Sequence, residues 1–129
     1  MHTFTLGWPP SVNHYWQSRR NGRGRYIGPA GVAFLEGTMI ACKMQHVPRQ
    51  TSGRVGLAIV VHPPNNIDRD LDNLSKATLD SLVKAGVLLG DSRKHLAYLS
   101  WEWGDNVPGG KLVIRCWRHF AKRTPTKES

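Results

Sequence analysis

Residues 68–86 read DRDLDNLSKATLDSLVKAG, and this stretch decides the fold that we expect. From Asp72 to about Ala85 the pattern predicts a helix, because one side of it repeats at helical spacing. Gly86 follows where helices commonly end in a left-handed residue. The residues on the repeating side are Leu71, Leu74, Thr78, Leu82 and Ala85. The stretch therefore predicts a helix that carries acidic residues at its N-terminal end.

The segments before this helix predict a buried strand and an earlier helix. Val55–Val61 is a continuous apolar run, typical of a central strand buried on both faces, and extended chain should continue to about Arg69. Pro29 to about Val47 predicts a helix that is apolar nearly all round. Its main stripe is Val32, Leu35, Met39 and Cys42. We expect this helix to be covered on two sides, the second cover being its own core or a partner subunit.

Shorter segments complete the expected elements. Thr3–Gly7 and Tyr26–Ile27 predict short strands. Two alternating segments predict further strands, and the loop between them predicts a hairpin. These are Leu96–Trp103 and Lys111–Trp117, joined by Asp105–Gly110. A chain of 129 residues makes one domain, which we place at residues 1–118, followed by a basic and poorly ordered tail at 119–129.

The charge balance points to a polyanionic partner. Lys and Arg number 18 against 9 Asp and Glu, a net charge of +9, and nucleic acid is the commonest partner of so basic a domain. No stretch predicts a membrane helix, and the N-terminus lacks a signal-peptide pattern, so we expect a cytoplasmic protein without a membrane partner. Cys42 and Cys116 are expected to be buried thiols. The sequence has no zinc spacing and no P-loop, and we expect no small organic cofactor.

The acidic cluster predicts a metal site. Asp68, Asp70 and Asp72 repel one another unless a cation offsets their charge, and Mg²⁺ is typically held by one or two carboxylates plus substrate phosphate. In extended chain Asp70 and Asp72 would point the same way, and Lys76 lies one helical turn further on. Asp91 would join them only if the chain folds back.

Two other interpretations of the cluster were considered. Asp70 or Asp72 would also serve as an ordinary helix cap. A Ca²⁺ loop does not fit, because Asn73 stands where glycine is required and Leu79 where a bidentate glutamate is required.

The motif Asp70-Leu71-Asp72-Asn73-Leu74-x-Lys76-Ala77 resembles the signature of the RusA family of Holliday-junction resolvases. The similarity continues through Lys84-Ala85-Gly86 to Asp91. The N-terminal Trp8-Pro9-Pro10-Ser11-x-Asn13 and the basic Asn21-Gly22-Arg23-Gly24-Arg25 are also similar to that family. The resemblance runs from about residue 4 to about residue 117.

The resemblance implies a single α/β domain of the α+β type, with a mixed sheet and two main helices. It also implies a homodimer that nicks two strands of a four-way DNA junction with Mg²⁺, for which Mn²⁺ would substitute. By position, Asp70, Asp72 and Asp91 match the family's catalytic, metal-binding acids, and Lys76 matches its helper lysine. Gly90 departs from the pattern, since relatives often carry a second acid there.

Several residues are expected to bind DNA. A flexible arm with four arginines would contact the DNA phosphates. Arg69, which lies beside the acids, and Asn13 would also contact the DNA. The arm residues are Arg19, Arg20, Arg23 and Arg25. Three other functions stay open from the sequence: a nuclease preferring flaps or forks, a non-catalytic DNA-binding module of the same fold, and a Mg²⁺-dependent nucleotidase acting on small phosphates.

Overall fold

The computed structural model describes residues 1–19, 22 and 24–119, and of Val12 and Asn13 the backbone alone. Arg20, Arg23 and most of the expected tail, residues 120–129, lie outside this description. The elements are β1 (His2–Gly7), α1 (Val12–Tyr15), β2 (Trp16–Ser18), β3 (Arg25–Ile27), α2 (Pro29–Met44), β4 (Arg54–His62), α3 (Asp72–Lys84), β5 (Leu96–Trp103) and β6 (Lys111–His119). None of the helices among the described residues combines the length and apolar character needed to cross a bilayer.

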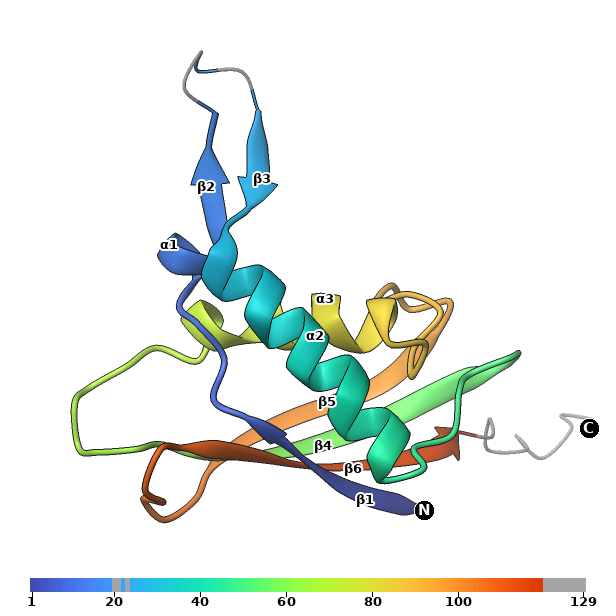
Figure 1. Cartoon of the computed structure of the whole chain (residues 1–129). Coiled ribbons are helices and arrows are strands. Elements are labelled where there is room, and N and C mark those ends of the chain that lie inside the picture. Colours follow the sequence, from blue (N-terminus) through green and yellow to red (C-terminus); the bar gives the residue numbers. More distant parts are fainter. Residues whose placement is uncertain (20–21, 23, 120–129) are drawn as a thin grey trace, which may run out of the picture.

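A four-stranded mixed sheet in the order β1-β6-β4-β5 forms the base of the domain. Strand β4 pairs parallel to β5 and antiparallel to β6. The helices α2 and α3 lie on the same side of this sheet, while β2 and β3 form a separate hairpin that projects away from the body (Figure 1). The mixed sheet, the two main helices and the single α+β domain are therefore confirmed.

The expected hairpin between the last two strands is wrong. β4 lies between β5 and β6, so these two strands are not neighbours. Their connection instead passes over the end of β4, where the Gly104 N–H donates to the Val61 carbonyl and the Val107 N–H to the Pro63 carbonyl, at 2.8 and 2.9 Å. Alternation along a strand shows which side chains face the core, but it does not show which strand lies next to it.

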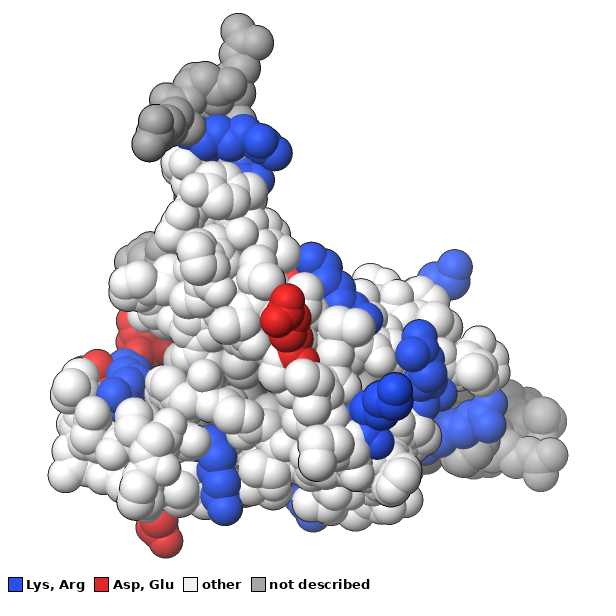
Figure 2. Space-filling model, in the orientation of Figure 1, with Lys and Arg blue, Asp and Glu red and all other residues white. Residues whose placement is uncertain are grey.

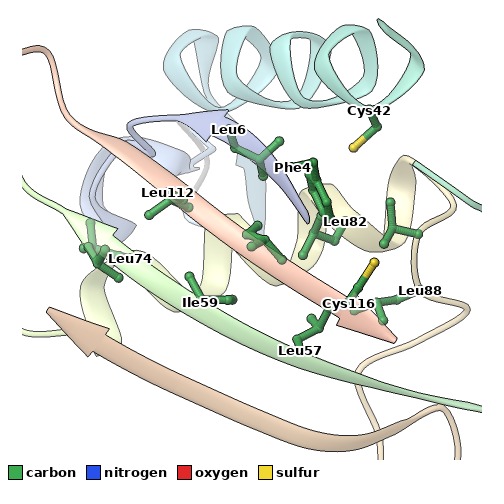
Figure 3. Packing of buried hydrophobic residues seen from close by; sticks show 13 residues of the cluster. Phe4, Leu6, Cys42, Leu57, Ile59, Leu74, Leu82, Leu88, Leu112 and Cys116 are labelled. Carbon is green, nitrogen blue, oxygen red and sulfur yellow. The ribbon is translucent and has the colours of Figure 1, made fainter. Parts of the chain in front are cut away.

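The core fills the space between the sheet and the two helices (Figure 3). β4 is central, as expected, and its residues 56–59 are all buried. Cys42 and Cys116 are buried free thiols, which confirms that expectation. Burial of the thiol raises the pKa of Cys42 to about 11, with a smaller contribution from Cys116. Side chains that meet in this core include Phe4, Leu6, Leu57, Ile59, Leu74, Leu82, Leu88, Leu112 and Ile114.

Helix α2 turns a different face to the core than its apolar stripe predicted. Gly31, Phe34, Thr38 and Cys42 are its buried residues. Val32 and Met39, from the expected stripe, are instead exposed, together with Ile40 and Met44. Gly31 explains which face of α2 is buried, because only a residue without a side chain lets the helix approach this closely. A Cβ at position 31 would lie 2.6 Å from Ile27 Cγ2 and 2.9 Å from Tyr15 Cδ2. A helix that is apolar all round does not itself specify which face is buried.

Gly56 of β4 lets the Trp117 ring lie directly against the strand. A Cβ on Gly56 would come within 2.3 Å of Trp117 Cε2. We therefore expect Gly56→Ala to lower the free energy of unfolding by about 1–3 kcal/mol, because the indole must move. Gly37→Ala is the matched control: its Cβ would meet nothing within 4 Å, and alanine in a helix should stabilise by about 0.5–1 kcal/mol. Urea unfolding of both variants measures the difference, and equal stabilities would contradict this packing.

Candidate metal centre and nucleic-acid interface

The acidic pair lies at the N-terminal end of α3. Leu71 precedes the helix in helical conformation, at φ −59° and ψ −34°, and Asp72 is the first helical residue. Leu71 packs against the core and Leu74 is buried within it. Because these two leucines point inward, Asp70 and Asp72 are left exposed to solvent around the first turn.

The expectation that Asp70 and Asp72 project in parallel from extended chain is wrong. The turn starts earlier, since the Asn73 N–H donates to the Asp70 carbonyl at 3.1 Å and the Ser75 N–H to that of Leu71 at 3.0 Å. Asp70 and Asp72 therefore belong to the first turn of α3 and not to one face of an extended strand. The capping alternative finds no support either, because α3 has no side-chain hydrogen bond at its cap position.

Lys76 and Arg69 flank this pair in different ways. Lys76 is exposed one turn beyond Asp72, and no described carboxylate lies within ion-pair distance of it. Arg69 is held by its own loop, donating to Asn65 Oδ1 at 2.6 Å and to the Ile67 carbonyl at 2.9 Å. Its guanidinium also lies over the Trp8 ring, 5.4 Å from the ring centroid. The Lys76 ammonium group is therefore available to a substrate phosphate. The Arg69 guanidinium mainly orders the loop that leads to Asp70 and Asp72.

Asp91 lies at the other end of α3. The helix has 13 residues, so its axis is about 20 Å long. Gly86 closes it at φ +84°, as the sequence predicted, and the chain continues through Asp91 to the start of β5 (Figure 1). Within the described residues no group of three or more His, Cys, Asp or Glu side chains is placed to hold a metal ion. One chain thus places Asp70 and Asp72 at the start of α3 and Asp91 beyond its other end.

The expected basic arm corresponds to the projecting hairpin of β2 and β3. Ser18 pairs with Arg25, and Arg19 and Arg25 are both exposed near its tip (Figure 2). Arg20 and Arg23 lie outside the described residues, as does the side chain of Asn13, whose backbone belongs to α1. The described part of the hairpin therefore presents cations away from the sheet.

A second, smaller cluster attaches this hairpin to the body. Tyr15 is fully buried and packs with Phe34 of α2 and Ala77 of α3, with Trp16 and Ile27 of the hairpin around them. The Tyr15 hydroxyl donates to the Asp80 carboxylate, and Asp80 also pairs with Lys84 at 3.6 Å. No local pattern predicted the Tyr15–Asp80 pair, because 65 residues separate its members and no motif joins them.

The protein is therefore a small, basic α+β domain that has an exposed carboxylate pair at the start of a helix and a cationic hairpin. The sequence profile of the family described as Endodeoxyribonuclease RusA matches residues 7–115. The chain belongs to this family.

Relatives in phage and bacteria support the assignment. The chain is 33% identical over 112 residues to the crossover junction endodeoxyribonuclease rusA of Enterobacteria phage HK97, covering 87% of this chain and 90% of that one. It is 38% identical over 93 residues to the crossover junction endodeoxyribonuclease RusA of Shigella sonnei (strain Ss046), and 37% identical over 93 residues to that of Escherichia coli (strain K12). Each of these two matches covers 71% of this chain and 75% of the relative.

The buried Tyr15 and its bond to Asp80 should make the free energy of unfolding decrease as the pH rises through the alkaline range. Burial of the phenol, and then the bond to Asp80, raise the pKa of Tyr15 well above its usual 10.0. The folded state therefore keeps a proton that the unfolded state loses above pH 10. The contribution of Tyr15 to the free energy of unfolding is complete below pH 10. Above pH 10 this contribution falls by about 1.4 kcal/mol per pH unit.

We expect Tyr15→Phe to remove this alkaline slope and to cost about 1–2 kcal/mol at neutral pH, since it deletes a hydrogen bond to a charged, partly exposed group. Urea unfolding of wild type and variant at pH 7 to 11 measures both effects. Tyr26→Phe is the control, because Tyr26 is exposed and its hydroxyl donates to Gln17 instead. Parallel pH curves for wild type and Tyr15→Phe would contradict the assignment.

Proposed function

We propose that this protein is a Mg²⁺-dependent endonuclease that resolves four-way DNA junctions by paired, symmetric nicks. The observation that carries the proposal is the exposed Asp70–Asp72 pair beside Lys76, in a chain whose family relatives are named crossover junction endodeoxyribonucleases. The excess of 18 cationic over 9 acidic residues suits a DNA substrate better than a small phosphate ester. The substrate DNA would be met in the bacterial cytoplasm.

The acidic pair fits a magnesium ion by its chemistry. Mg²⁺ is commonly bound by one or two carboxylates and completes its shell with water and substrate phosphate oxygens, and Mn²⁺ accepts similar ligands. When bound, the metal would polarise the scissile phosphate and lower the pKa of a bound water. Asp70 and Asp72 would hold and orient the ion. Lys76, free of described ion pairs, would stabilise negative charge developing on the phosphate.

A homodimer would supply the third acid. β5 is an edge strand, and Tyr98, Leu99 and Trp103 are exposed along it. A two-fold axis at this edge would pair β5 antiparallel to its copy, so that the start of one strand lies beside the end of the other. The start of β5 follows Asp91, and its end adjoins the end of β4, from which the chain leads to Asp70.

Each of the two sites would then combine Asp70 and Asp72 of one subunit with Asp91 of the partner subunit. An isologous dimer has two such sites related by its two-fold axis. That symmetry matches the two equivalent strands of a four-way junction, which accounts for paired nicks.

Asp72→Asn should slow cleavage strongly and leave DNA binding intact. We expect the rate on a labelled four-way junction with Mg²⁺ to fall by about 10²–10³-fold, since an anionic ligand becomes neutral. Asp68→Asn makes the same charge change at an exposed position two residues before Asp70 and should cut normally. EDTA should stop the wild-type reaction. Normal cutting by Asp72→Asn would refute the site, and faster cutting of flaps or forks would reassign the substrate.

Mixed dimers test whether the site is shared. Asp70→Asn and Asp91→Asn homodimers should each be inactive. A heterodimer of the two variants would concentrate both defects in one site and leave the other intact, so mixing the two inactive proteins should restore single nicks. Asp70→Asn mixed with Asp72→Asn is the control: both changes affect the same half of the site, so no intact site forms. If the Asp70→Asn and Asp91→Asn mixture stays inactive although subunits exchange, the shared site is excluded.

A further inference from the structure

Five exposed cations gather at the end of the sheet opposite the acidic pair. We call this surface the basic end; its members are Arg49, Arg54, Arg93, Lys94 and Arg118. They lie where β4 begins, where β6 ends and in the turn before β5. Figure 2 shows Lys and Arg atoms on the right-hand part of the molecule, with no Asp or Glu atoms visible there on this face. None of these cations was among the DNA-binding residues expected from the sequence.

A buried side chain holds the loops of the basic end together. Gln50 is 8% exposed, and its amide nitrogen donates to the carbonyls of Gly53 at 2.8 Å and His95 at 3.1 Å. Its amide oxygen accepts from the Leu89 N–H at 2.6 Å. The loop before β4 is thereby fixed to the turn that carries Arg93 and Lys94. The backbone segments that carry these cations are therefore held in place before any ligand binds.

Four of these cations have no carboxylate partner among the described residues. No described carboxylate lies within ion-pair distance of Arg49, Arg54, Arg93 or Lys94, whereas Lys84 nearby pairs with Asp80. Arg54 donates through Nε to the Arg93 backbone carbonyl at 2.9 Å, which holds the Arg54 side chain against the turn that carries Arg93 and Lys94. Like charges held close together repel one another, and a bound polyanion would relieve this repulsion.

A hollow within the basic end offers polar contacts suited to phosphate. It has a volume of about 390 Å³, and no carboxylate is among its lining residues. Arg49, Thr51, Ser52 and Arg118 all line it, and Arg118 Nη2 donates to Ser52 Oγ at 3.2 Å. Guanidinium and hydroxyl groups are among the side-chain groups that contact DNA phosphates. A surface of this kind reads the backbone and not the base sequence.

We propose that the basic end binds the phosphate backbone of a double-stranded arm of the substrate. This inference rests on the proposed function, which supplies the DNA. In the proposed dimer, Asp91 lies beside the acidic pair of the partner subunit. Arg93 and Lys94 follow Asp91 in the chain, so they would lie near the same acidic pair. Each arm leaving a cleavage site would therefore run across the basic end of the partner subunit. Contacts of this kind add affinity for any duplex and leave the choice of branched over linear DNA to other residues.

The test compares two charge-matched double variants. Arg49→Gln with Arg118→Gln removes two cations from the basic end. Lys111→Gln with Arg115→Gln removes two from elsewhere on the sheet and is the control. Dissociation constants are measured for a four-way junction and for a linear duplex over a range of salt concentrations without divalent metal. Thermal unfolding shows whether each variant is folded, and Arg93→Gln with Lys94→Gln replaces the first variant if it is not.

The basic-end variant should bind both DNAs several-fold more weakly than the wild-type protein does. Its slope of log affinity against log salt should fall by about 2 for each basic end in contact with DNA, because each of the two lost phosphate contacts removes about 0.9. An unchanged slope would overturn the inference and leave this surface to an acidic protein partner. An equal loss in the control would also overturn it, by showing an effect of net charge alone. The proposed function fails separately, if the wild-type protein does not cut the junction with Mg²⁺.

Discussion

The packing of α3 onto the sheet is the constraint on which the rest of the structure depends. Its inner face is made of Leu74, Ala77, Thr78, Ser81 and Leu82, all buried. The two hydroxyls on this face bond back to the helix, Thr78 to the Leu74 carbonyl at 2.8 Å and Ser81 to that of Thr78 at 2.9 Å, so small polar residues can face the core without leaving unpaired groups. Because this face is fixed, Asp72 and Lys76 must face solvent, and the axis of the helix separates Asp72 from Asp91.

That separation gives the domain two chemically different ends. Asp68, Asp70 and Asp72 stand at one end of α3, and Arg93 and Lys94 follow Asp91 at the other. In the two-fold arrangement proposed above, the acidic end of each subunit would face the basic end of its partner. Complementary charge of this kind favours the antiparallel arrangement over a parallel one. The same contact would place cations and metal-binding carboxylates around one substrate phosphate.

The hairpin of β2 and β3 is attached in a different way from the sheet. It contributes no strand to the main sheet, and a small cluster around Tyr15 joins it to α2 and α3. Tyr15, the last residue of α1 and directly before β2, donates a hydrogen bond to Asp80 of α3. The orientation of this cationic hairpin therefore depends on few contacts, whereas the carboxylate pair is fixed by the main core.

The amino-acid sequence predicted correctly those features that follow from local patterns. The start of α3, its closure at Gly86, the buried run of β4 and the burial of Cys42 and Cys116 were all predicted, since periodicity and turn chemistry act over a few residues. Long-range contacts place β4 between β5 and β6, make α2 bury Phe34 and not Met39, and set Asp91 beyond the opposite end of α3 from Asp72. These features depend on which distant segments pair and how closely they approach, and a one-dimensional pattern carries no measure of either.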